Sequence, residues 1–405
     1  MTEQTNTPKL RFPEFKDEWK LQKLGNLAQF SKGKSLSKKD LNINGNPCIL
    51  YGELYTKYGA ILNKVYSKTS TQNDSLVFSK RNQILIPSSG ETDIDIATAT
   101  AIDTDVKIAI GGDLNIITPI NSDGRFISLY INGKGKYNLA KYAQGKSVVH
   151  LYNSDIKKLN FYLPTNMAEQ KKVGDFFSKL DQQTELEEKK LELLEQQKKG
   201  YMQKIFSQEL RFKDDNGNSY PDWSIKKIED ISKVNKGFTP NTKNDEYWDE
   251  LNENWLSIAG MTQKYLYKGN KGITEKGASK HVKVDKDTLI MSFKLTLGKL
   301  AIVKEPIYTN EAICHFVWKE SNVNTEYMYY YLNSINISTF GAQAVKGVTL
   351  NNDSINSIIV KLPVIQEQNK IAYFFNELDK LIRKQYAKIE VLKQRKKGLL
   401  QKMFI

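Results

Sequence analysis

Hydrophobic positions in two stretches of the chain, about 167–206 and about 365–405, recur at alternating steps of four and three residues. A repeat that averages 3.5 residues is typical of a coiled-coil seam, so the pattern predicts two long helices that pack together. The predicted seam residues are Phe177, Leu180, Glu187, Leu191, Leu194 and Lys198 in the first helix, and Phe375, Leu378, Gln385, Ile389, Leu392 and Lys396 in the second.

Polar residues interrupt both predicted seams at matching places. If the helices pair antiparallel with Glu187 opposite Lys396, then Lys198 falls opposite Gln385. One register would then satisfy both interruptions, which is how buried polar residues specify the alignment of a coiled coil. We predict this register; the alternative is that these positions lie in frayed or solvated parts of the seam.

The two helical stretches belong to a larger internal repeat, because the second half of the chain repeats the first about 198 residues further on. Glu169-Gln170 returns as Glu367-Gln368, and the stretch 198–206 returns as 396–404. A duplicated unit in one chain predicts a molecule with an approximate two-fold axis. Such a molecule suits a target that is itself two-fold, and duplex DNA is the leading candidate.

The remaining segments alternate Tyr-, Ile-, Val- and Thr-rich runs with Gly, Asn and Asp, a pattern typical of β-rich domains. Their openings and ends match, whereas their middles differ, so they are expected to share a frame and read different targets. We predict an α+β fold with four segments: a recognition domain at 1–166, a helical repeat at 167–207, a second recognition domain at 208–363 and a second helical repeat at 364–405.

The composition favours a polyanionic partner, because 60 basic and 46 acidic side chains give a net charge of +14. The two cysteines and three histidines do not occur at zinc-ligand spacing, so no metal site is expected, and a reducing cytoplasm is the natural setting. The sequence contains neither an apolar signal segment nor a run of about 18 apolar residues, so secretion and membrane insertion are not expected.

Catalytic motifs are missing from the sequence. An adenine methyltransferase would need an Asn/Asp-Pro-Pro-aromatic element, but all ten prolines stand singly. A phosphate-binding loop would need Gly-x4-Gly-Lys-Ser/Thr, and that spacing does not occur either. Three scattered histidines do not support a nucleophile and base set. The chain is therefore not expected to be an enzyme.

Two short motifs recur in both halves. Leu163-Pro164 precedes Glu169-Gln170, Leu362-Pro363 precedes Glu367-Gln368, and both helices end in Lys-Lys-Gly-x-x-Gln-Lys-x-Phe. With the alternating segments, these motifs resemble the specificity subunit of type I restriction-modification systems. The resemblance covers essentially the whole chain and is weakest in the centres of the two recognition domains.

The resemblance implies a non-catalytic subunit in which each recognition domain reads one half of a split, asymmetric site in double-stranded DNA, while the helices fix the gap between the halves. It implies two modification subunits, which methylate adenine with S-adenosylmethionine, and ATP-dependent restriction subunits as partners. S-adenosylmethionine, ATP and Mg²⁺ are expected in these partners, and no cofactor is expected in this chain.

Candidate DNA contacts are of two kinds. Exposed lysines would contact phosphates, and short polar side chains on loops would contact base edges. The loops that we favour are Tyr51–Leu54, Pro87–Gly90 and Gln144–Ser147 in the first domain, with counterparts at Ser292–Lys294 and Gln343–Gly347 in the second. The candidate DNA-binding residues are Lys32, Lys34, Tyr51, Gly52, Ser88, Ser89, Gln144, Lys146, Ser147, Lys264, Lys268, Ser292, Lys294, Gln343 and Lys346. Solvated lysines and ordinary turns are the plainer interpretation of the same residues.

Two other classes of protein compete with a DNA reader. A duplicated coiled-coil adaptor would explain the heptads equally well, but it has no need of two large and divergent β-rich domains. A self-sufficient restriction or methylation enzyme would need the motifs that are missing. Methyl transfer by the purified chain alone would separate these classes, and we expect none.

Overall fold

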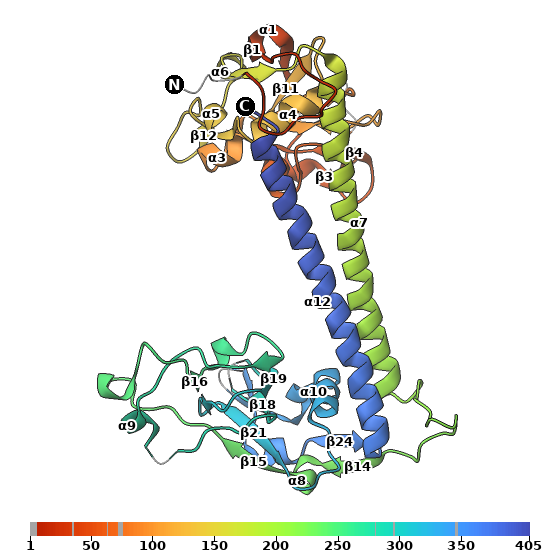
Figure 1. The fold of residues 1–405 in the computed structure, drawn as a ribbon, viewed down its shortest axis with the longest axis vertical. Coiled ribbons are helices and arrows are strands. Elements are labelled where there is room, and N and C mark those ends of the chain that lie inside the picture. Colours follow the sequence, from red (N-terminus) through yellow and green to blue (C-terminus); the bar gives the residue numbers. More distant parts are fainter. Residues whose placement is uncertain are drawn as a thin grey trace. The chain divides into compact units, whose positions relative to one another are not determined.

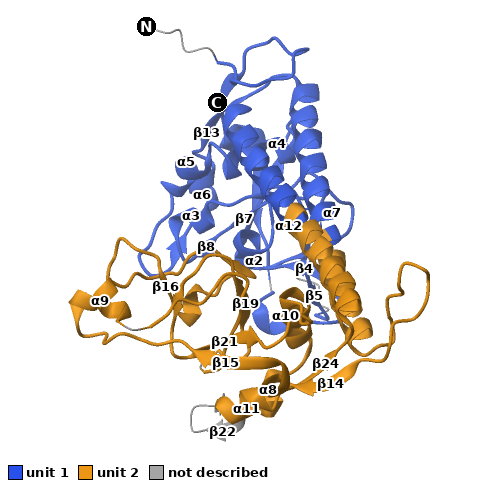
Figure 2. Cartoon of the chain, turned by 60° about the horizontal axis from the view of Figure 1, so that its bottom comes forward, with its two compact units in different colours: residues 1–190, 385–405 blue, residues 191–384 orange. Residues whose placement is uncertain are grey.

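The computed structural model describes residues 6–34, 36–62, 64–71, 76–279, 281–294, 296–344 and 347–405, with the backbone alone for 342–344 and 347–349. The chain divides into two compact units (Figure 2): unit 1 contains residues 1–190 and 385–405, and unit 2 contains residues 191–384. Each unit therefore combines one β-rich domain with a part of each long helix.

The two long helices are α7 (Met167–Phe206) and α12 (Ile365–Lys402), and they run side by side within each unit (Figures 1 and 2). In unit 1, Lys396 pairs with Asp181, while the Gln385 amide donates to the Glu187 carboxylate at 2.7 Å. The residue number falls along α12 as it rises along α7. The predicted antiparallel pairing is confirmed.

The predicted register is wrong. Glu187 contacts Gln385 and Lys388 instead of Lys396, and in unit 2 Lys198 forms an ion pair with Asp379 at 2.6 Å. Asp181 and Asp379 stand next to seam positions, so the heptad analysis did not count them as partners. In the observed register, both seam lysines pair with carboxylates. The predicted register would have placed Lys198 opposite a neutral amide.

The polar contacts of the helices follow the internal repeat. Asp379 is the repeat equivalent of Asp181, and Lys396 is that of Lys198, so the two ion pairs are the same contact made once in each unit. Glu187, in contrast, contacts its own repeat equivalent, Gln385. A contact between equivalent positions marks the midpoint of the pairing.

Cross-linking tests this register. With Cys48 and Cys314 both buried, cysteines introduced on the two long helices can be cross-linked selectively. A Glu187→Cys, Gln385→Cys double variant is expected to react with a short bis-maleimide and to produce one new cross-linked peptide in a mass spectrum. A Glu187→Cys, Lys396→Cys variant is the matched control and should remain largely uncross-linked. Efficient cross-linking in the control alone would restore the rejected register.

The described residues of unit 1 form two sheets and two short ribbons. The core lies mainly between the four-stranded sheet and helix α4 (Gly124–Asn132). The four-stranded sheet has the order β2 (Ala28–Lys32), β11 (Leu114–Pro119), β7 (Ile84–Pro87), β9 (Thr100–Ala101). The five-stranded sheet has the order β3 (Leu41–Asn42), β5 (Ser67–Thr69), β4 (Asn46–Ile49), β10 (Ala109–Ile110), β6 (Val77–Phe78). The ribbons pair β1 (Lys20–Lys23) with β13 (Asn160–Leu163) and β8 (Ser89–Gly90) with β12 (Val149–His150). The short helices are α1 (Leu24–Leu27), α2 (Tyr51–Thr56), α3 (Asp93–Ile96), α5 (Lys136–Ala140) and α6 (Asn153–Ile156).

Unit 2 is built around one larger sheet, and helix α10 (Thr325–Ser334) contributes to its core. The sheet has the order β15 (Ser232–Lys236), β21 (Ile313–Trp318), β18 (Leu289–Ser292), β19 (Leu300–Val303), β17 (Tyr265–Leu266). Two-stranded ribbons pair β14 (Ser224–Lys227) with β24 (Ile359–Leu362), β16 (Trp255–Leu256) with β20 (Tyr308–Thr309), and β22 (Ala342–Ala344) with β23 (Gly347–Thr349). The short helices are α8 (Ile228–Ile231), α9 (Glu275–Ala278) and α11 (Asn352–Asn356).

The two β-rich domains share one hydrogen-bonded frame. Strand β2 pairs with β11 and β15 pairs with β21 in equivalent registers, and so do the ribbons β1–β13 and β14–β24. Outside this frame the domains differ, since the sheet β3-β5-β4-β10-β6 of unit 1 has no counterpart of the same order in the part of unit 2 that the structure describes. The expected combination of a common frame and divergent interiors is therefore present.

The repeated end of each long helix closes the core of one unit. Phe404, 2% exposed, follows α12 and packs in unit 1, with ring centroids 5.0 Å from Phe126 and 6.3 Å from Trp19. Its repeat equivalent Phe206 stacks on Phe375 at 5.8 Å in unit 2. The recurring Lys-x-Phe ending thus supplies a core residue, and the last residues of the chain belong to unit 1.

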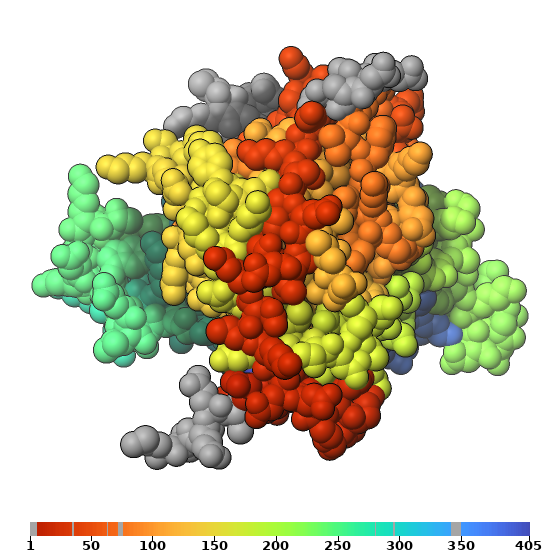
Figure 3. Space-filling model, turned by 90° about the horizontal axis from the view of Figure 1, so that it is seen from above, coloured from red at the N-terminus to blue at the C-terminus, as the bar shows by residue number. Residues whose placement is uncertain are grey.

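The repeated Glu-Gln motif anchors each long helix to its domain. Arg11 donates two hydrogen bonds to the carboxylate of Glu169, at 2.7 and 2.8 Å, and Trp19 donates a third at 3.2 Å. The N-terminal segment that carries Arg11 and Trp19 lies along the outside of unit 1 (red in Figure 3). Arg211, Trp223 and Glu367 repeat the arrangement in unit 2. The recurring tryptophans, 2% and 7% exposed, are therefore core anchors.

The glutamine of the motif joins the helix to the loop before it. Gln170 donates to the carbonyl of Pro164 at 2.8 Å and accepts from the backbone of Asp123 at 2.9 Å. Gln368 likewise donates to the carbonyl of Pro363 and accepts from the backbone of Asn324. These contacts explain why Leu-Pro and Glu-Gln recur together in the sequence.

Candidate nucleic-acid interface

The loop after Ala143 in unit 1 is an exposed hairpin. Gln144 and His150 exchange two backbone hydrogen bonds, of 2.9 and 2.7 Å, which close the turn. Gly145 has φ +124°, and a Cβ there would stand 2.1 Å from the carbonyl oxygen of Val148, so the turn requires glycine. Lys146 and Ser147 are exposed at its tip. An exposed loop with a cation and a hydroxyl has the composition expected of a DNA-contacting element.

Two further predicted residues lie beside this hairpin. Ribbon β8–β12 places Ser89 opposite His150, and the Ser89 hydroxyl lies 3.2 Å from Nδ1 of that histidine. The His150 ring stacks on Tyr152, and Nζ of Lys32 is 5.7 Å from the centroid of the tyrosine ring. We call this set the hairpin surface, and its members are Lys32, Ser89, Gln144, Lys146, Ser147, His150 and Tyr152.

The hairpin surface contains two residues that the sequence analysis missed, His150 and Tyr152. Their position directly after a favoured loop was the available signal, because a hairpin returns its second strand beside the first. The side-chain amide of Gln144 is less available for base contact, because it donates a hydrogen bond to the Asp155 carboxylate at 3.1 Å. The surface nevertheless offers cationic, hydroxyl and aromatic groups together, which are the groups that contact phosphates and bases.

Tyr51 and Gly52 do not lie on a loop. They open helix α2, and the carboxylate of Glu53 accepts a hydrogen bond from the backbone of Leu50 at 3.0 Å, which caps the helix. The loop predicted for Tyr51–Leu54 is wrong. Gly52 suggested a turn, but the Glu53 cap stabilises a helix at this place. Both residues are half-buried, and Lys34 is exposed in the segment after β2.

Ser88 and Ser292 are buried, at 5% and 0% exposure, so neither side chain reaches the surface of its domain. The Ser292 hydroxyl donates to the carbonyl of Thr296 and accepts from the backbone of Lys299 at 3.0 Å, which holds the turn after β18. In the shared frame the equivalent of Ser88 is Phe293, since their backbone N–H groups donate to Asp113 and Ala312 respectively. We do not include either serine in the interface.

Lys264 is placed in a buried polar cluster instead of on an open surface. Its side chain is 7% exposed, and its ammonium lies 2.5 Å from the Glu326 carboxylate and 2.8 Å from the hydroxyl of Tyr330. Burial lowers the pKa of Lys264, and the hydrogen bond from Lys264 to Glu326 opposes that shift. An ammonium committed to these partners is not available to a phosphate, so Lys264 is removed from the interface.

The structure describes the side chains of two of the remaining four candidates in unit 2, Lys268 and Lys294. Lys268 is exposed and pairs with Glu253 at 2.5 Å, and Lys294 is exposed with Nζ 5.7 Å from the Phe293 ring. Gln343 lies in β22, where the backbone alone is described, and Lys346 lies outside the described residues. The ribbon β22–β23 occupies the place in the frame that the hairpin occupies in unit 1.

Lys236 is a unit 2 lysine that the sequence analysis did not select. It ends β15 as Lys32 ends β2, and its Nζ is 4.7 Å from the centroid of the Phe293 ring. The two lysines thus occupy one position of the shared frame, each beside an aromatic ring. The matching Lys-Gly pairs at 32–33 and 236–237 were the signal for this equivalence.

Comparison with known proteins decides the family. A sequence model described as "Type I restriction modification DNA specificity domain" matches residues 16–196 and again 220–394. The chain belongs to the family of type I restriction-modification specificity subunits. The double match follows the internal repeat, one copy for each β-rich domain with its helix.

Curated relatives of this specificity subunit come from Methanocaldococcus jannaschii. The MjaIX specificity subunit is 30% identical over 209 residues, which cover 49% of this chain and 48% of that protein. The MjaVIII specificity subunit is 22% identical over 427 residues, covering 96% and 93% of the two chains. The match therefore spans about half of the first relative and nearly all of the second.

Solved structures share the fold. The S subunit of a type I system from M. genitalium aligns with a TM-score of 0.59 at 17% identity, over 98% of this chain and 99% of that one. A chain from a study of assembly and conformational transition of the type I R-M system aligns with a TM-score of 0.60 at 11% identity, over 94% and 96%. The expected fold class is confirmed over essentially the whole specificity subunit.

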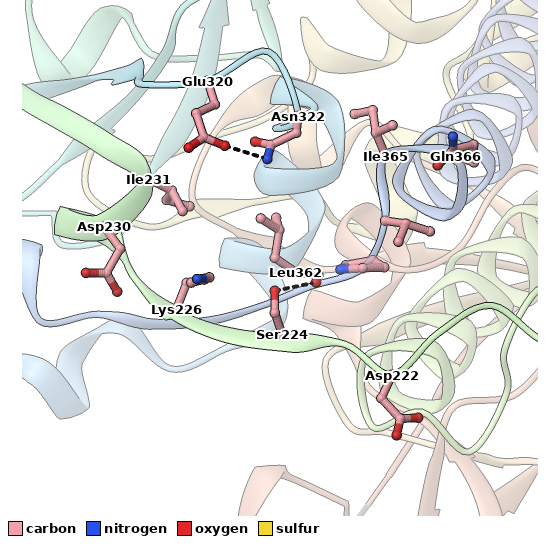
Figure 4. A pocket seen from close by; sticks show the side chains of 12 residues that line it. Asp222, Ser224, Lys226, Asp230, Ile231, Glu320, Asn322, Leu362, Ile365 and Gln366 are labelled. Carbon is pink, nitrogen blue, oxygen red and sulfur yellow. Dashed lines mark hydrogen bonds between the residues drawn. The ribbon is translucent and has the colours of Figure 1, made fainter.

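A cavity of about 450 Å³ in unit 2 of the specificity subunit lies between ribbon β14–β24 and the start of α12 (Figure 4). The Ser224 hydroxyl donates to the carbonyl of Leu362 at 3.0 Å on one wall. The acidic side chains of Asp222, Asp230 and Glu320 line it, with Lys226 as the single cation among the lining residues. Carboxylates repel the DNA backbone, so this cavity is excluded from the interface.

Within the described parts of the chain, no three Asp, Glu, His or Cys side chains are arranged to hold a metal ion, and no helix combines the length and the apolar character needed to cross a membrane. Both cysteines are buried thiols, and burial raises the pKa of Cys48 to about 11.

His315 gives unit 2 a predictable response to acid. The side chain is 8% exposed beside Thr309, and burial lowers its pKa to about 4 from an ordinary value of 6.5. The unfolded chain therefore binds a proton that the folded unit excludes, and stability is lost as pH falls below 6.5. Between pH 6.5 and pH 5 the expected loss is on the order of 2 kcal/mol.

Hydrogen exchange of unit 2 peptides at the two pH values, corrected for intrinsic exchange, measures this loss. A His315→Gln variant, whatever its stability at pH 7, should show a clearly smaller pH dependence. An equal loss in the variant and the parent would mean that His315 is not the group that titrates.

Proposed function

We propose that this chain is the DNA-reading, non-catalytic subunit of a type I restriction-modification complex, and that each recognition domain reads one half of a bipartite, asymmetric site. The observation that carries this proposal is the shared frame. It places Lys32 and Lys236 at equivalent positions and surrounds them with different side chains. A common docking pose with different neighbours is what reading two different half-sites requires.

The partners follow from this role. Double-stranded DNA is the ligand, two modification subunits transfer methyl groups from S-adenosylmethionine to adenine, and restriction subunits use ATP and Mg²⁺. Exposed apolar residues at equivalent places on the helices, Leu193 at 56% and Val391 at 65%, support docking of one modification subunit on each copy of the repeat. Free buried thiols suit the cytoplasm as the site of action.

Methylome sequencing tests the function directly. The chain would be expressed with a matching modification subunit in a host that lacks adenine methylation. Adenine methylation at one split motif, lost when this chain is omitted, is the expected result. A stable complex that binds no DNA and methylates no motif would instead favour the runner-up function, a duplicated coiled-coil adaptor without sequence-specific DNA binding.

Lysines of the hairpin surface are expected to contribute to affinity through phosphates. Lys32→Ala and Lys146→Ala should each weaken DNA binding and reduce the slope of log K against log salt by about 1, because each lost phosphate contact releases one fewer counterion. Fluorescence anisotropy with the assembled methyltransferase at several salt concentrations measures both effects. Lys20→Ala, which removes an exposed lysine of ribbon β1–β13, is the control and should leave the slope unchanged.

A further inference from the structure

After Lys32 and after Lys236, the backbone passes close to another segment of its own domain, residues 110–114 in unit 1 and residues 309–313 in unit 2. We call each of these close approaches a crossing. In unit 1 the N–H of Gly33 donates to Leu114 and that of Lys34 to Ile110, at 3.0 and 3.3 Å. In unit 2 the N–H of Gly237 donates to Ile313 and that of Phe238 to Thr309, at 3.1 and 2.8 Å. Leu114 and Ile313 are equivalent in the shared frame, and Ile110 and Thr309 each precede them by four residues, so the crossing is one feature made twice.

Glycine is required at both crossings. A Cβ on Gly33 would stand 2.0 Å from the carbonyl oxygen of Gly111, and one on Gly237 would stand 2.1 Å from that of Thr309. Contacts this short with backbone cannot be relieved by moving a side chain. The chain therefore passes each crossing in one fixed way, and whatever follows the crossing is held in a defined place.

A cavity borders the crossing in unit 1. It has a volume of about 620 Å³, and its lining includes Leu36, Lys38, Tyr51, Tyr55, Glu91 and the backbone of Gly111. Partial burial, with the charge of Glu91 among the lesser causes, raises the pKa of Tyr55, so its hydroxyl is a neutral donor at physiological pH. The walls thus combine aromatic rings with a hydrogen-bond donor, a cation and carboxylate acceptors.

A second cavity borders the crossing in unit 2, with a volume of about 400 Å³. The Phe238 and His281 rings stack on each other along it, with centroids 3.6 Å apart and planes 6° from parallel. Lys236 and Lys283 also line it, against one carboxylate, Asp285. Donors and stacked rings prevail here, whereas acceptors and donors are mixed in the first cavity.

We infer that these two cavities are the specificity-determining sites of the two recognition domains, each taking one nucleotide of its half-site. The inference rests on the proposed function and adds where the bases are read. Both volumes lie in the range that holds a molecule of nucleotide size. Aromatic rings stack on bases, lysines donate to guanine or phosphate oxygens, and carboxylates accept from the amino groups of cytosine or adenine.

The position of the cavities explains how one docked pose reads two sequences. The crossing fixes the backbone identically in both domains, while the residues that line the cavities differ in kind. Donor-rich walls in unit 2 select a base that presents acceptors, and the mixed walls of unit 1 select a base that also presents an amino group. A nucleotide that enters either cavity leaves the base stack, and unstacking favours flexible steps at that position.

The test uses the methylated motif as its readout, because the motif reports each half separately. Phe238→Ala with His281→Ala should relax one position in one half of the motif, with discrimination there falling at least tenfold, while the other half is unchanged. Tyr55→Ala should relax one position in the opposite half. The unaltered half of each motif shows that the variant is folded and assembled. Tyr267→Ala and Tyr137→Ala, which remove exposed tyrosines from unit 2 and unit 1, are the matched controls.

Three outcomes would overturn the inference. The first is an unchanged motif in both halves for all cavity variants, and the second is a weakening of both halves alike without any relaxed position. The third is binding of a free mononucleotide, measured by calorimetry, that is lost in the cavity variants while the motif stays intact, since this would make the cavities small-molecule sites. A parent complex that yields no motif at all would refute the proposed function itself, which is a different failure.

Discussion

Phe404→Ala is expected to destabilise unit 1 by about 3–5 kcal/mol, although residue 404 is the penultimate residue of the chain. The side chain is 2% exposed, and its ring lies among those of Trp19, Phe126, Tyr130 and Phe177. Truncation to alanine would remove these contacts and leave a cavity that the surrounding strands and helices cannot fill. The effect should be confined to unit 1, because the contacts of Phe404 lie there.

Hydrogen exchange with mass spectrometry is the suitable measurement, because it reports the two units separately. Faster exchange is expected in peptides of unit 1 that form its core, with little change in unit 2. Phe206→Ala is the matched variant and should give the reverse pattern, since Phe206 packs in the core of unit 2. Tyr373→Ala, which removes a 68% exposed ring from α12, should change neither. Unchanged protection in Phe404→Ala would show that the end of the chain is not part of the core.

Arg211→Ala is the second change with a large expected effect, about 3–5 kcal/mol on unit 2. Arg211 donates two hydrogen bonds to Glu367, whose side chain is fully buried, and Trp223 donates one more. Without the guanidinium, the buried carboxylate would retain the indole N–H as its one hydrogen-bond donor among the described side chains. An uncompensated buried charge is among the most destabilising features that a single substitution can create.

Three variants make this prediction specific. Urea denaturation followed by hydrogen exchange of unit 2 peptides measures the loss. Lys370→Ala removes an ion pair with the 94% exposed Asp215 and should have no measurable effect, because solvent screens such pairs. The double variant Arg211→Met, Glu367→Met should recover much of the stability, since it removes both charges together. A double variant no more stable than Arg211→Ala would mean that the loss comes from packing and not from the unpaired carboxylate.

Local periodicity was sufficient to predict the helices, whereas the register depended on residues outside the period. The 3.5-residue spacing predicted α7 and α12 and their antiparallel pairing. The pairing of Lys198 with Asp379 and of Lys396 with Asp181 decided the alignment, and both acids lie beside the seam. A lysine side chain is long enough to reach past its own seam position, so seam residues alone do not determine its partner.

Residue type was a weaker guide to the interface than to the fold. Lys264 stands in a Lys-rich stretch, yet tertiary packing encloses its ammonium with Glu326 and Tyr330. Tyr51 and Gly52 suggested a turn, but the Glu53 cap makes a helix there. In contrast, the hairpin at Gln144–Ser147 could be predicted, because glycine, lysine and serine between two apolar runs leave few alternatives to an exposed turn.

The equivalences within the repeat were predictable only at the ends of the domains. The Lys-Gly pairs at 32–33 and 236–237 match in sequence, but the acceptors of their hydrogen bonds come from strands β11 and β21, whose sequences differ. A backbone carbonyl group accepts a hydrogen bond regardless of which side chain its residue carries. The frame is therefore conserved between the two units in hydrogen bonds that a comparison of side chains does not reveal.

The place of Phe404 also determines the order in which this protein can be completed as it is synthesised. Domains generally fold as they leave the ribosome, the N-terminal one first. Unit 2 needs only residues 191–384, whereas unit 1 lacks its closing segment, residues 385–405, until the whole of unit 2 has been synthesised. At about 5–20 residues per second, the first domain made would wait on the order of 10–40 s for its last core residue. A chain that is cut short near its end would thus contain a finished second domain and an open first one, which exposes its apolar interior to chaperones and proteases.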